Sequence, residues 1–159
     1  MAIDRARAHL AQLGLEDRIQ EFDQSSATVE LAARAVGCEP ARIAKTLSFS
    51  MGDRVALILF AGDARINNQK FKAQFHTKPK MLPAADAEAR IGHGVGGVCP
   101  FGVNDGCDVY LDVSLKRFDV VYPAAGSANS AVRLSLDELQ RACQPCEWVD
   151  VSQLPEAQA

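Results

Sequence analysis

The sequence predicts an α+β protein, in which strands and helices follow one another without a regular repeat. Apolar residues recur at helical spacing over residues 3–13, whereas residues 55–61 form a nearly unbroken apolar run of strand length. About seven strands and four or five helices, besides the short helical segment 41–44, are expected in mixed order, which is an α+β arrangement. With 159 residues the chain has the size of one domain, and we expect a single domain over residues 1–159.

The composition is that of a globular protein. Apolar residues make up 48% of the chain and charged residues 23%, which excludes a mainly disordered protein. The N-terminus lacks the apolar segment of a signal peptide, and residues 55–61 are too few to span a bilayer. We therefore expect a cytoplasmic protein with no membrane contact, whose five cysteines are reduced thiols rather than a disulfide framework.

The helices are recognised by the signals at their ends. Residues 3–13 place an apolar stripe before Gly14, and residues 29–36 lie between Thr28, a good N-cap, and Gly37, a stop signal. Further helical segments are expected at residues 41–44, 67–75, 84–91 and, after Ser135 as N-cap, 136–143.

The strands are recognised as apolar and β-branched runs between turn signals. We expect strands at residues 19–22, 46–50, 55–61, 109–112, 119–122, 131–134 and 147–151. The run 55–61 is apolar nearly throughout, so we expect it to be buried on both faces at the centre of the sheet. Residues 152–159 are expected to form a loose tail.

Residues 92–102 carry five of the eleven glycines and a proline, so they cannot form a helix and make a poor strand. A flexible linker would carry serine and charge instead of Val95, Val98 and Phe101. Two interpretations remain open: a shaped loop whose backbone approaches a ligand, or a buried turn between two core elements. The spacing is neither that of a dinucleotide-binding motif nor that of a P-loop.

Lys45 lies where the expected helix 41–44 passes into the strand 46–50, among residues that are mostly apolar. A lysine in such a position usually extends its ammonium group to solvent. The pattern alone is compatible with a functional lysine and with a solvated one.

The clearest charge asymmetry is in residues 65–80, which contain five basic residues and no acidic one. This segment carries +5, so the rest of a chain of net charge −3 carries −8. The apolar stripe of the expected helix leaves the lysines outward, as a solvated face or as a patch for the phosphates of one folded RNA. The candidate RNA-binding residues are Lys70, Lys72, Lys78 and Lys80.

The sequence shows no pattern for metal or covalent chemistry. Cys143 and Cys146 form a C-x-x-C pair, but no second pair and no histidine lies at zinc-binding spacing. A redox pair of the thioredoxin type would lie at a strand-to-helix junction, whereas this pair follows the last expected helix. No compact Ser/His/Asp or Cys/His arrangement is visible either. We expect no metal and no cofactor.

Four segments occur in an informative order: Thr28-Val29-Glu30, then Pro-Ala-Arg-Ile-Ala-Lys-Thr-Leu at 40–47, Val-Gly-Gly-Val-Cys-Pro-Phe-Gly at 95–102, and Leu-Ser-Leu-Asp-Glu-Leu at 134–139. Together they resemble the YbaK/ProX family of aminoacyl-tRNA-editing deacylases over residues 20–151. The second and third segments are specific as a pair. The resemblance implies a curved, mixed β-sheet, partly barrel-like and surrounded by helices, as in the prolyl-tRNA-synthetase-associated domain fold.

The resemblance also implies an active site. Lys45 matches the functional lysine of the family, and Gly96, Gly97, Val98 and Cys99 match the loop whose N–H groups stabilise the oxyanion. Many relatives have serine in place of Cys99, so the implied role there is one of the backbone. A lysine is a poor general base at neutral pH, so Lys45 would hold the substrate while a substrate hydroxyl helps to activate water. The implied substrate-binding residues are Thr28, Thr46, Pro100, Phe101, Gly102 and Gly126.

The expected function is that of a free-standing trans-editing deacylase, which hydrolyses the ester of a mischarged aminoacyl-tRNA. The resemblance points to tRNA(Pro), and small residues in the pocket regions suit a small amino acid such as alanine, cysteine or serine. The implied partners are mischarged aminoacyl-tRNA and, as a candidate, prolyl-tRNA synthetase. Two alternatives stay open: a deacylase of the same family for a different tRNA, and a non-catalytic module that binds an amino acid or aminoacyl-tRNA in the same pocket.

Overall fold

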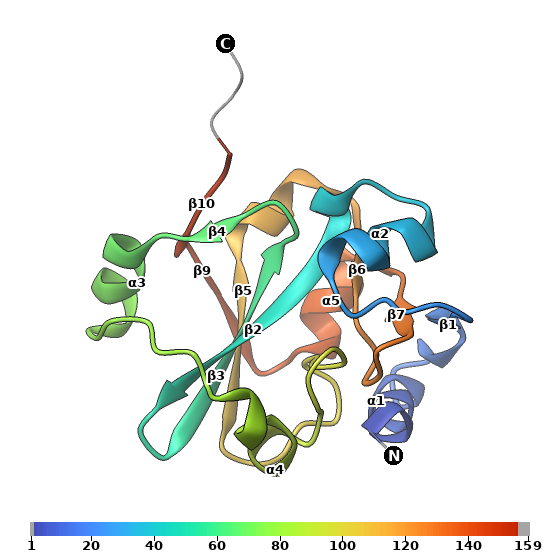
Figure 1. Cartoon of the computed structure of the whole chain (residues 1–159), viewed down its shortest axis with the longest axis horizontal. Helices are drawn as coiled ribbons and strands as arrows, with labels where there is room; N and C mark the ends of the chain where they lie inside the picture. Colours follow the sequence, from blue (N-terminus) through green and yellow to red (C-terminus); the bar gives the residue numbers. More distant parts are fainter. Residues whose placement is uncertain (1, 156–159) are drawn as a thin grey trace.

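The computed structural model describes residues 2–155, and its main feature is a strongly curled six-stranded sheet (Figure 1). The strand order is β8-β6-β2-β3-β5-β9, with antiparallel pairing of β2 with β3 and of β6 with β8, and parallel pairing elsewhere. The mixed sheet forms a half barrel with helices around it, which confirms the predicted α+β fold. The six strands are β2 (Ile43–Met51), β3 (Arg54–Ala61), β5 (Cys107–Asp112), β6 (Val120–Pro123), β8 (Leu134–Ser135) and β9 (Cys146–Val149).

β3 has an inner position in the sheet and is almost wholly buried. Every residue from Val55 to Ala61 is buried, as the apolar run predicted. The strand pairs with β2 on one side, where Phe60 lies opposite Lys45, and with β5 on the other. Full burial of a large apolar side chain stabilises the folded state by roughly 1.5–3 kcal/mol. The sheet is therefore organised around β3.

β2 begins earlier than the sequence indicated. Its first two residues pair with Tyr122 and Pro123 of β6, so the strand starts two residues before Lys45. The predicted helix 41–44 is wrong, because the structure has a 3-10 turn, Pro40–Arg42, which ends where this pairing begins. Lys45 therefore lies inside a strand, and the sheet sets the direction of its backbone.

Two short ribbons lie beside the main sheet. They are β1 (Ile19–Glu21) with β7 (Ser130–Val132), and β4 (Arg65–Ile66) with β10 (Ser152–Gln153). The predicted strand 131–134 is therefore wrong as a single element, because β7 and β8 pair with different partners, β1 and β6.

A buried carboxylate attaches Val151 and the first residue of β10 to the sheet. Asp112 is fully buried and accepts hydrogen bonds from the Val151 N–H at 2.9 Å and the Ser152 hydroxyl at 2.6 Å. The expectation of a loose tail from residue 152 is wrong at β10 for this reason. The last four residues of the expected tail, 156–159, lie outside the described part of the chain.

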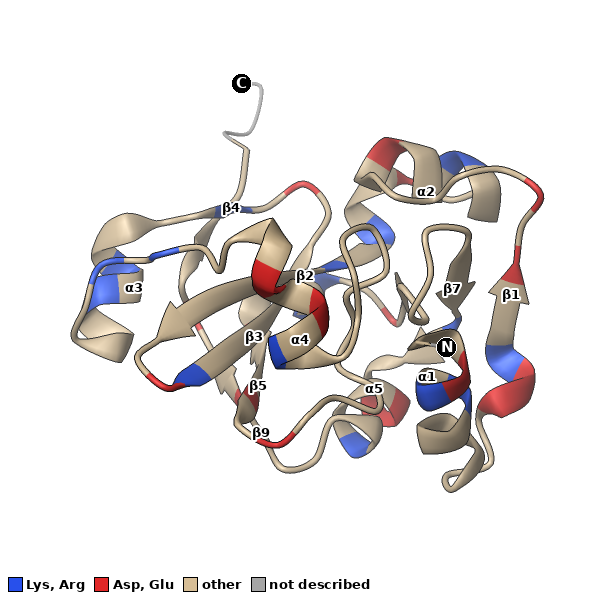
Figure 2. Ribbon diagram, turned by 60° about the horizontal axis from the view of Figure 1, so that its bottom comes forward, with Lys and Arg blue, Asp and Glu red and all other residues tan. Residues whose placement is uncertain are grey.

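Helices lie around the sheet, with α3 at one end of the molecule and α1 and α2 at the other (Figures 1 and 2). The α-helices of the described residues are α1 (Ala2–Ala11), α2 (Val29–Val36), α3 (Asn68–Phe75), α4 (Ala87–Ile91) and α5 (Leu136–Ala142). The predicted caps Thr28, Gly37 and Ser135 are confirmed, whereas the predicted helix 84–91 is a 3-10 turn followed by α4. None of these helices has the length and apolar character needed to cross a membrane.

Aromatic side chains attach α3 to the sheet. The ring of Phe71 lies 4.9 Å from that of Phe49 in β2 and 4.7 Å from that of Phe75, measured between centroids. Phe75 in turn lies 5.0 Å from Tyr110 of β5, edge to face. Phe71 is completely buried, so the apolar side of α3 faces the sheet and its lysines face outward, as predicted.

We expect Ser135→Ala to lower the free energy of unfolding by about 1 kcal/mol, because it removes a helix cap. The Ser135 hydroxyl accepts from the Glu138 N–H at 3.1 Å, and the Glu138 carboxylate accepts from the Ser135 N–H at 2.9 Å. Urea unfolding measures the change. An effect no larger than that of Thr77→Ala, at an exposed position outside the helices, would contradict the prediction.

Candidate active site

A cavity of about 390 Å³ opens beside the first half of β2. Its walls come from parts of the chain that are distant in sequence: the start of α2, β2, the segment from Leu82 to Ala87, the glycine-rich loop, and the segment from Tyr122 to Ala131. The predicted site residues that line the cavity are Thr28, Lys45, Thr46, Gly96 and Val98.

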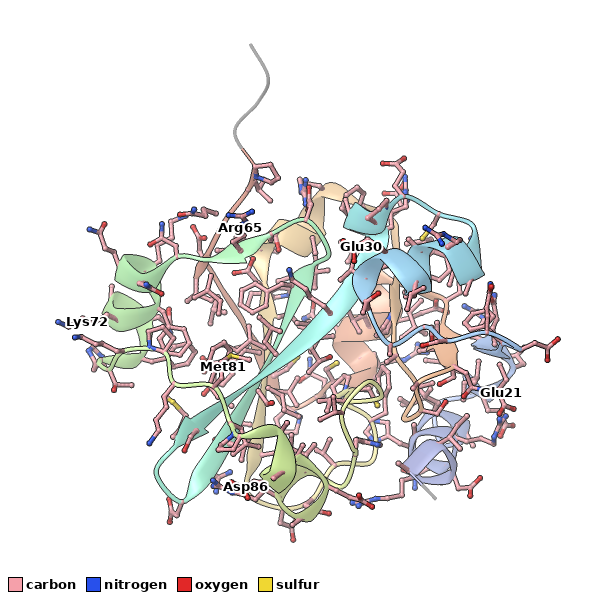
Figure 3. The ribbon with its side chains drawn as sticks, viewed as in Figure 1. Glu21, Glu30, Arg65, Lys72, Met81 and Asp86 are labelled. Atoms are coloured by element: carbon pink, nitrogen blue, oxygen red, sulfur yellow. The ribbon has the colours of Figure 1, made fainter. Side chains whose placement is uncertain are left out.

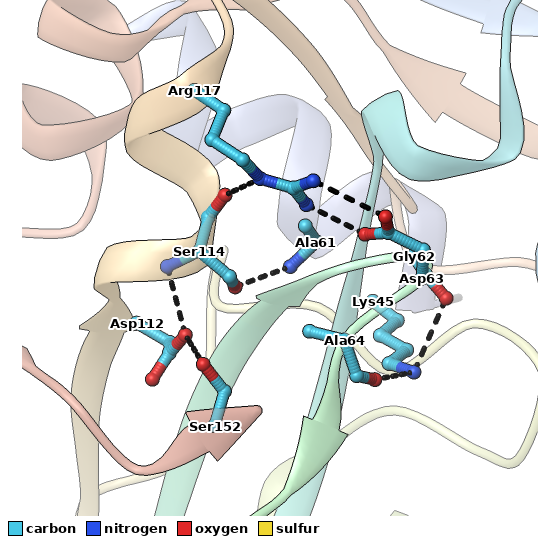
Figure 4. A network of polar contacts seen from close by, with 9 residues as sticks. All are labelled: Lys45, Ala61, Gly62, Asp63, Ala64, Asp112, Ser114, Arg117 and Ser152. Atoms are coloured by element: carbon cyan, nitrogen blue, oxygen red, sulfur yellow. Dashed lines mark hydrogen bonds and ion pairs between the residues drawn. The ribbon is translucent and has the colours of Figure 1, made fainter. Parts of the chain in front are cut away.

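Lys45 reaches from β2 to the turn that follows β3. Its Nζ donates hydrogen bonds to two backbone carbonyls, at 3.3 Å from the Gly62 oxygen and 2.6 Å from the Ala64 oxygen (Figure 4). An ammonium group has three N–H donors, so one donor remains for a ligand. Carbonyl oxygens carry no formal charge, and they hold the ammonium group without cancelling its charge.

Burial and neighbouring charges act on Lys45 in opposite directions. Its pKa is lowered from the ordinary value of 10.5, first because burial disfavours the charged form. Asp63 and Glu30 raise the pKa, while Arg65 lowers it further. The two acidic residues therefore partly restore the preference of this half-buried lysine for its charged form.

The glycine-rich loop, residues 92–102, packs directly against a second loop of small residues, 124–130. Gly96 has a φ of +88°, and a Cβ at this position would lie 3.2 Å from the Cβ atoms of Ala27 and Ala128. Gly97 is buried, and a Cβ there would lie 2.6 Å from the Ser127 nitrogen, closer than real Cβ contacts. Gly97 is therefore required by the close approach of two backbone segments, whereas Gly96 is favoured mainly by its positive φ.

The N–H groups of this loop differ in their availability. The Gly97 N–H donates to the Gly94 carbonyl at 3.1 Å and so closes a turn within the loop. Within residues 2–155, no hydrogen bond uses the N–H of Gly96, Val98 or Cys99. Gly96 and Val98 also line the cavity, so their N–H groups are the better candidates for contact with a ligand.

Cys99 is completely buried beneath the loop and does not line the cavity. Its Sγ lies 3.5 Å from His93 Nε2, and burial raises the pKa of the thiol to about 12. The same Nε2 lies 2.6 Å from the Phe101 carbonyl oxygen, to which it donates, and burial lowers the pKa of His93. A nucleophilic cysteine needs a lowered pKa, so this Cys/His pair is structural.

The remaining predicted substrate-binding residues of the two loops lie away from the cavity and attach the loops to their surroundings. Phe101 is completely buried, with its ring centroid 5.7 Å from that of His9 in α1. The Gly102 N–H donates to His9 Nδ1 at 3.1 Å, and Gly126 packs against the backbone of α1 at a φ of +97°. Pro100 lines a separate hollow beside His9.

The two predicted threonines differ in their hydrogen bonding. Thr28 caps α2, where its hydroxyl accepts from the Leu31 N–H at 3.2 Å. The hydroxyl oxygen of Thr46 is buried and has no hydrogen-bond partner among the described residues. Because buried polar groups are nearly always paired, the Thr46 hydroxyl is a candidate contact for a ligand in the cavity.

Lys70 and Lys72 lie on α3, Lys78 and Lys80 follow shortly after its end, and none of the four lines the cavity. Lys70 forms an ion pair with Asp150 at 3.1 Å and donates to the Ser152 carbonyl at 3.0 Å. Lys72, Lys78 and Lys80 are exposed, and Lys72 points away from the molecule (Figure 3).

Gly62, Asp63 and His93 stand in no sequence motif that indicates a functional role. A Cβ at Gly62 would collide with the Pro40 carbonyl, so only glycine fits there. The available signal was weak, because a glycine and an aspartate after a buried strand are typical of any turn.

The fold and the cavity define an α+β protein with a preformed site for a small ligand. A family model described as the aminoacyl-tRNA editing domain matches residues 23–142. The uncharacterized protein YwhH of Bacillus subtilis (strain 168) is 47% identical over 152 residues, which cover 95% of this chain and 97% of that protein.

Two further similarities extend over most of the chain. EbsC of Enterococcus faecalis, a candidate Cys-tRNA(Pro)/Cys-tRNA(Cys) deacylase, is 26% identical over 117 residues, which cover 72% of this chain and 71% of that protein. The crystal structure of a candidate trans-editing enzyme for prolyl-tRNA synthetase has a TM-score of 0.85 at 26% identity, covering 96% of this chain and 97% of that one.

The chain belongs to the aminoacyl-tRNA editing domain family. The resemblance to editing deacylases is thereby confirmed, and the protein is an aminoacyl-tRNA deacylase. The cavity beside β2 is its candidate active site.

We expect Gly97→Ala to lower both the melting temperature and deacylase activity, because the new methyl group would push the two loops apart. Gly94→Ala is the matched control in the same loop, since a Cβ there would meet only the end of the Glu88 side chain at 3.9 Å. Thermal unfolding and single-turnover deacylation compare the two variants. Equal behaviour of both would show that the contact between Gly97 and Ser127 does not shape the site.

Proposed function

We propose that this protein is a free-standing trans-editing deacylase, which removes a small amino acid from mischarged tRNA(Pro). The observation that carries the proposal is the cavity beside β2, whose lining combines the partly buried Lys45 with mostly small side chains. Its volume of about 390 Å³ lies within the range of small-molecule sites, about 300–1,000 Å³. Alanines such as Ala32, Ala44 and Ala131 line it and leave room for a small side chain such as that of alanine, cysteine or serine.

The choice of tRNA is supported by the similar proteins. EbsC is named for Cys-tRNA(Pro) and Cys-tRNA(Cys), and the similar crystal structure is that of a trans-editing candidate for prolyl-tRNA synthetase. We accordingly propose tRNA(Pro) as the carrier, prolyl-tRNA synthetase as a partner, and the cytoplasm, where aminoacyl-tRNA is made and used, as the location.

In the proposed mechanism, water attacks the ester carbonyl and the N–H groups of Gly96 and Val98 stabilise the resulting oxyanion. One such donor typically contributes about 100- to 1,000-fold to the rate. The third N–H of Lys45 holds the substrate, and the unpaired Thr46 hydroxyl donates or accepts one further hydrogen bond. A hydroxyl of the terminal ribose helps to activate the water.

The proposed reaction has no covalent intermediate on cysteine. Cys99 is the one cysteine of the glycine-rich loop, and its thiol is buried, protonated at neutral pH and outside the cavity wall. The ester bond between the amino acid and the ribose oxygen is cleaved directly. The products are the free amino acid and tRNA with its terminal hydroxyl restored.

We expect the purified protein to hydrolyse Ala-, Cys- or Ser-tRNA(Pro) and to leave correctly charged Pro-tRNA(Pro) largely intact. Lys45→Met, which keeps the length of the side chain and removes its charge, should lower the deacylation rate at least about 100-fold, because the cation no longer positions the ester. Release of labelled amino acid measures the rate. Binding without turnover of any of these substrates would favour a non-catalytic module, and turnover of another mischarged tRNA alone would reassign the carrier.

We also propose that the exposed lysines beside α3 contact the phosphates of the acceptor stem. The triple change Lys72→Glu, Lys78→Glu and Lys80→Glu should raise the KM for aminoacyl-tRNA, because phosphate contacts add a salt-dependent attraction. Activity on a minimal aminoacyl-adenosine should stay unchanged, since these residues lie outside the cavity wall. Arg141→Glu, at an exposed position on α5, is the control. An equal loss on both substrates, or no loss on tRNA, would remove this patch from the interface.

A further inference from the structure

The turn that holds Lys45 is itself held by an arginine from another part of the chain. Asp63 lies between the two residues whose carbonyls accept from Lys45 Nζ, Gly62 and Ala64. Both oxygens of its carboxylate accept from Arg117, at 2.6 Å from Nη2 and 3.2 Å from Nη1 (Figure 4). A bidentate pair of this kind fixes orientation as well as distance.

Arg117 is restrained on its other sides. Its Nε donates to the Ser114 carbonyl at 3.0 Å, and its guanidinium lies 4.8 Å from the ring centroid of Phe118. The side chains of Asp63 and Arg117 are only 27% and 34% exposed, so solvent competes less for the pair than at an open surface.

The polar contacts continue behind Arg117 to the buried Asp112. The Ser114 hydroxyl accepts from the Ala61 N–H at 3.0 Å, at the last residue of β3. The Ser114 N–H in turn donates to Asp112, at 2.9 Å from Oδ2. The turn after β3 is therefore connected through Ser114 and Arg117 to a carboxylate in the core (Figure 4).

We propose that Asp63 and Arg117 are a positioning pair for Lys45: they fix the turn whose carbonyls hold the ammonium group and keep the Asp63 carboxylate from pairing with it directly. The proposal rests on the role proposed above for Lys45. Neither residue lines the cavity, so both act through Lys45 and not by contact with the substrate.

The arrangement keeps a negative charge near Lys45 without a direct ion pair to its ammonium group. A lysine that forms a direct ion pair would offer less positive charge to a substrate. The structure places a carboxylate near enough to raise the pKa of Lys45, while Arg117 occupies its oxygens and neutral carbonyls make the direct contacts. The other charged groups that act on Lys45 are Glu30 on α2 and Arg65 on β4, and neither is altered by the test below.

The test uses two variants that shift the pKa of Lys45 in opposite directions. Asp63→Asn removes the neighbouring negative charge and should lower this pKa, whereas Arg117→Gln frees the carboxylate and should raise it. An NMR titration of the Lys45 side chain measures both shifts without any substrate. Both variants should also lower kcat/KM about 10- to 100-fold through misplacement of the ammonium group.

Asp108→Asn is the matched control. Arg54 and Asp108 form a second bidentate pair, with both distances 2.8 Å, at the opposite end of β3 and outside the cavity wall. This control should leave the Lys45 titration and kcat/KM unchanged. In a Lys45→Met background, Asp63→Asn should cause no further loss of activity.

Unchanged titration of Lys45 in both variants, or the same activity loss for the control, would overturn the proposal. If one variant does not fold, the other still decides, because each predicts its own direction of shift. If the wild-type protein hydrolyses no aminoacyl-tRNA, the proposed function fails while the titration still tests the pair. Opposite shifts of the Lys45 pKa would then support the positioning pair on their own.

Discussion

The antiparallel pairing of β2 with β3 is the constraint on which the site depends. It continues from Ala44 opposite Ala61 to Met51 opposite Arg54, and it joins a partly exposed strand to one that is buried on both faces. Because β3 has no freedom to shift within the core, β2 is held in one register. Lys45 therefore always lies beside the end of β3 and the turn that follows it.

Close backbone packing provides the second constraint. Gly97 lies against Ser127, Gly102 and Gly126 lie against α1, and Gly62 lies against Pro40. At each contact a Cβ would overlap neighbouring atoms, so space requires glycine at all four positions. Gly102 and Gly126 also have a positive φ, which is a second, conformational reason for glycine. These contacts connect the walls of the cavity to elements that are otherwise separate. The site is consequently assembled by tertiary packing, although most of its residues lie on loops and strand ends.

Polar groups around the cavity divide into those that are satisfied and those that are left for a ligand. Thr28, the Gly97 N–H and the Nε2 atom of His93 make hydrogen bonds within the protein, and they stabilise α2 and the loop. The Nδ1 atom of His93 is buried and has no partner among the described residues. The Thr46 hydroxyl and the Gly96 N–H have no partner within residues 2–155. The Thr46 hydroxyl oxygen is buried, and a buried polar group without a partner costs about 1–3 kcal/mol, which a substrate can recover on binding.

The sequence by itself determined the α+β class, the buried strand β3, the caps Thr28 and Ser135, and the two segments that contain Lys45 and the glycine-rich loop, because these follow from local patterns and short motifs. Only the tertiary structure decided that β2 begins before Lys45, that Ser152 joins a strand, and that Asp63 and Arg117 meet beside Lys45. Strand pairs and side-chain contacts of this kind join segments that are far apart in the sequence. A local pattern in one segment does not show which other segment will pair with it. The physical reason is that a local pattern shows which face of a helix or strand is buried. The packing of the whole core selects which residues of distant segments come into contact.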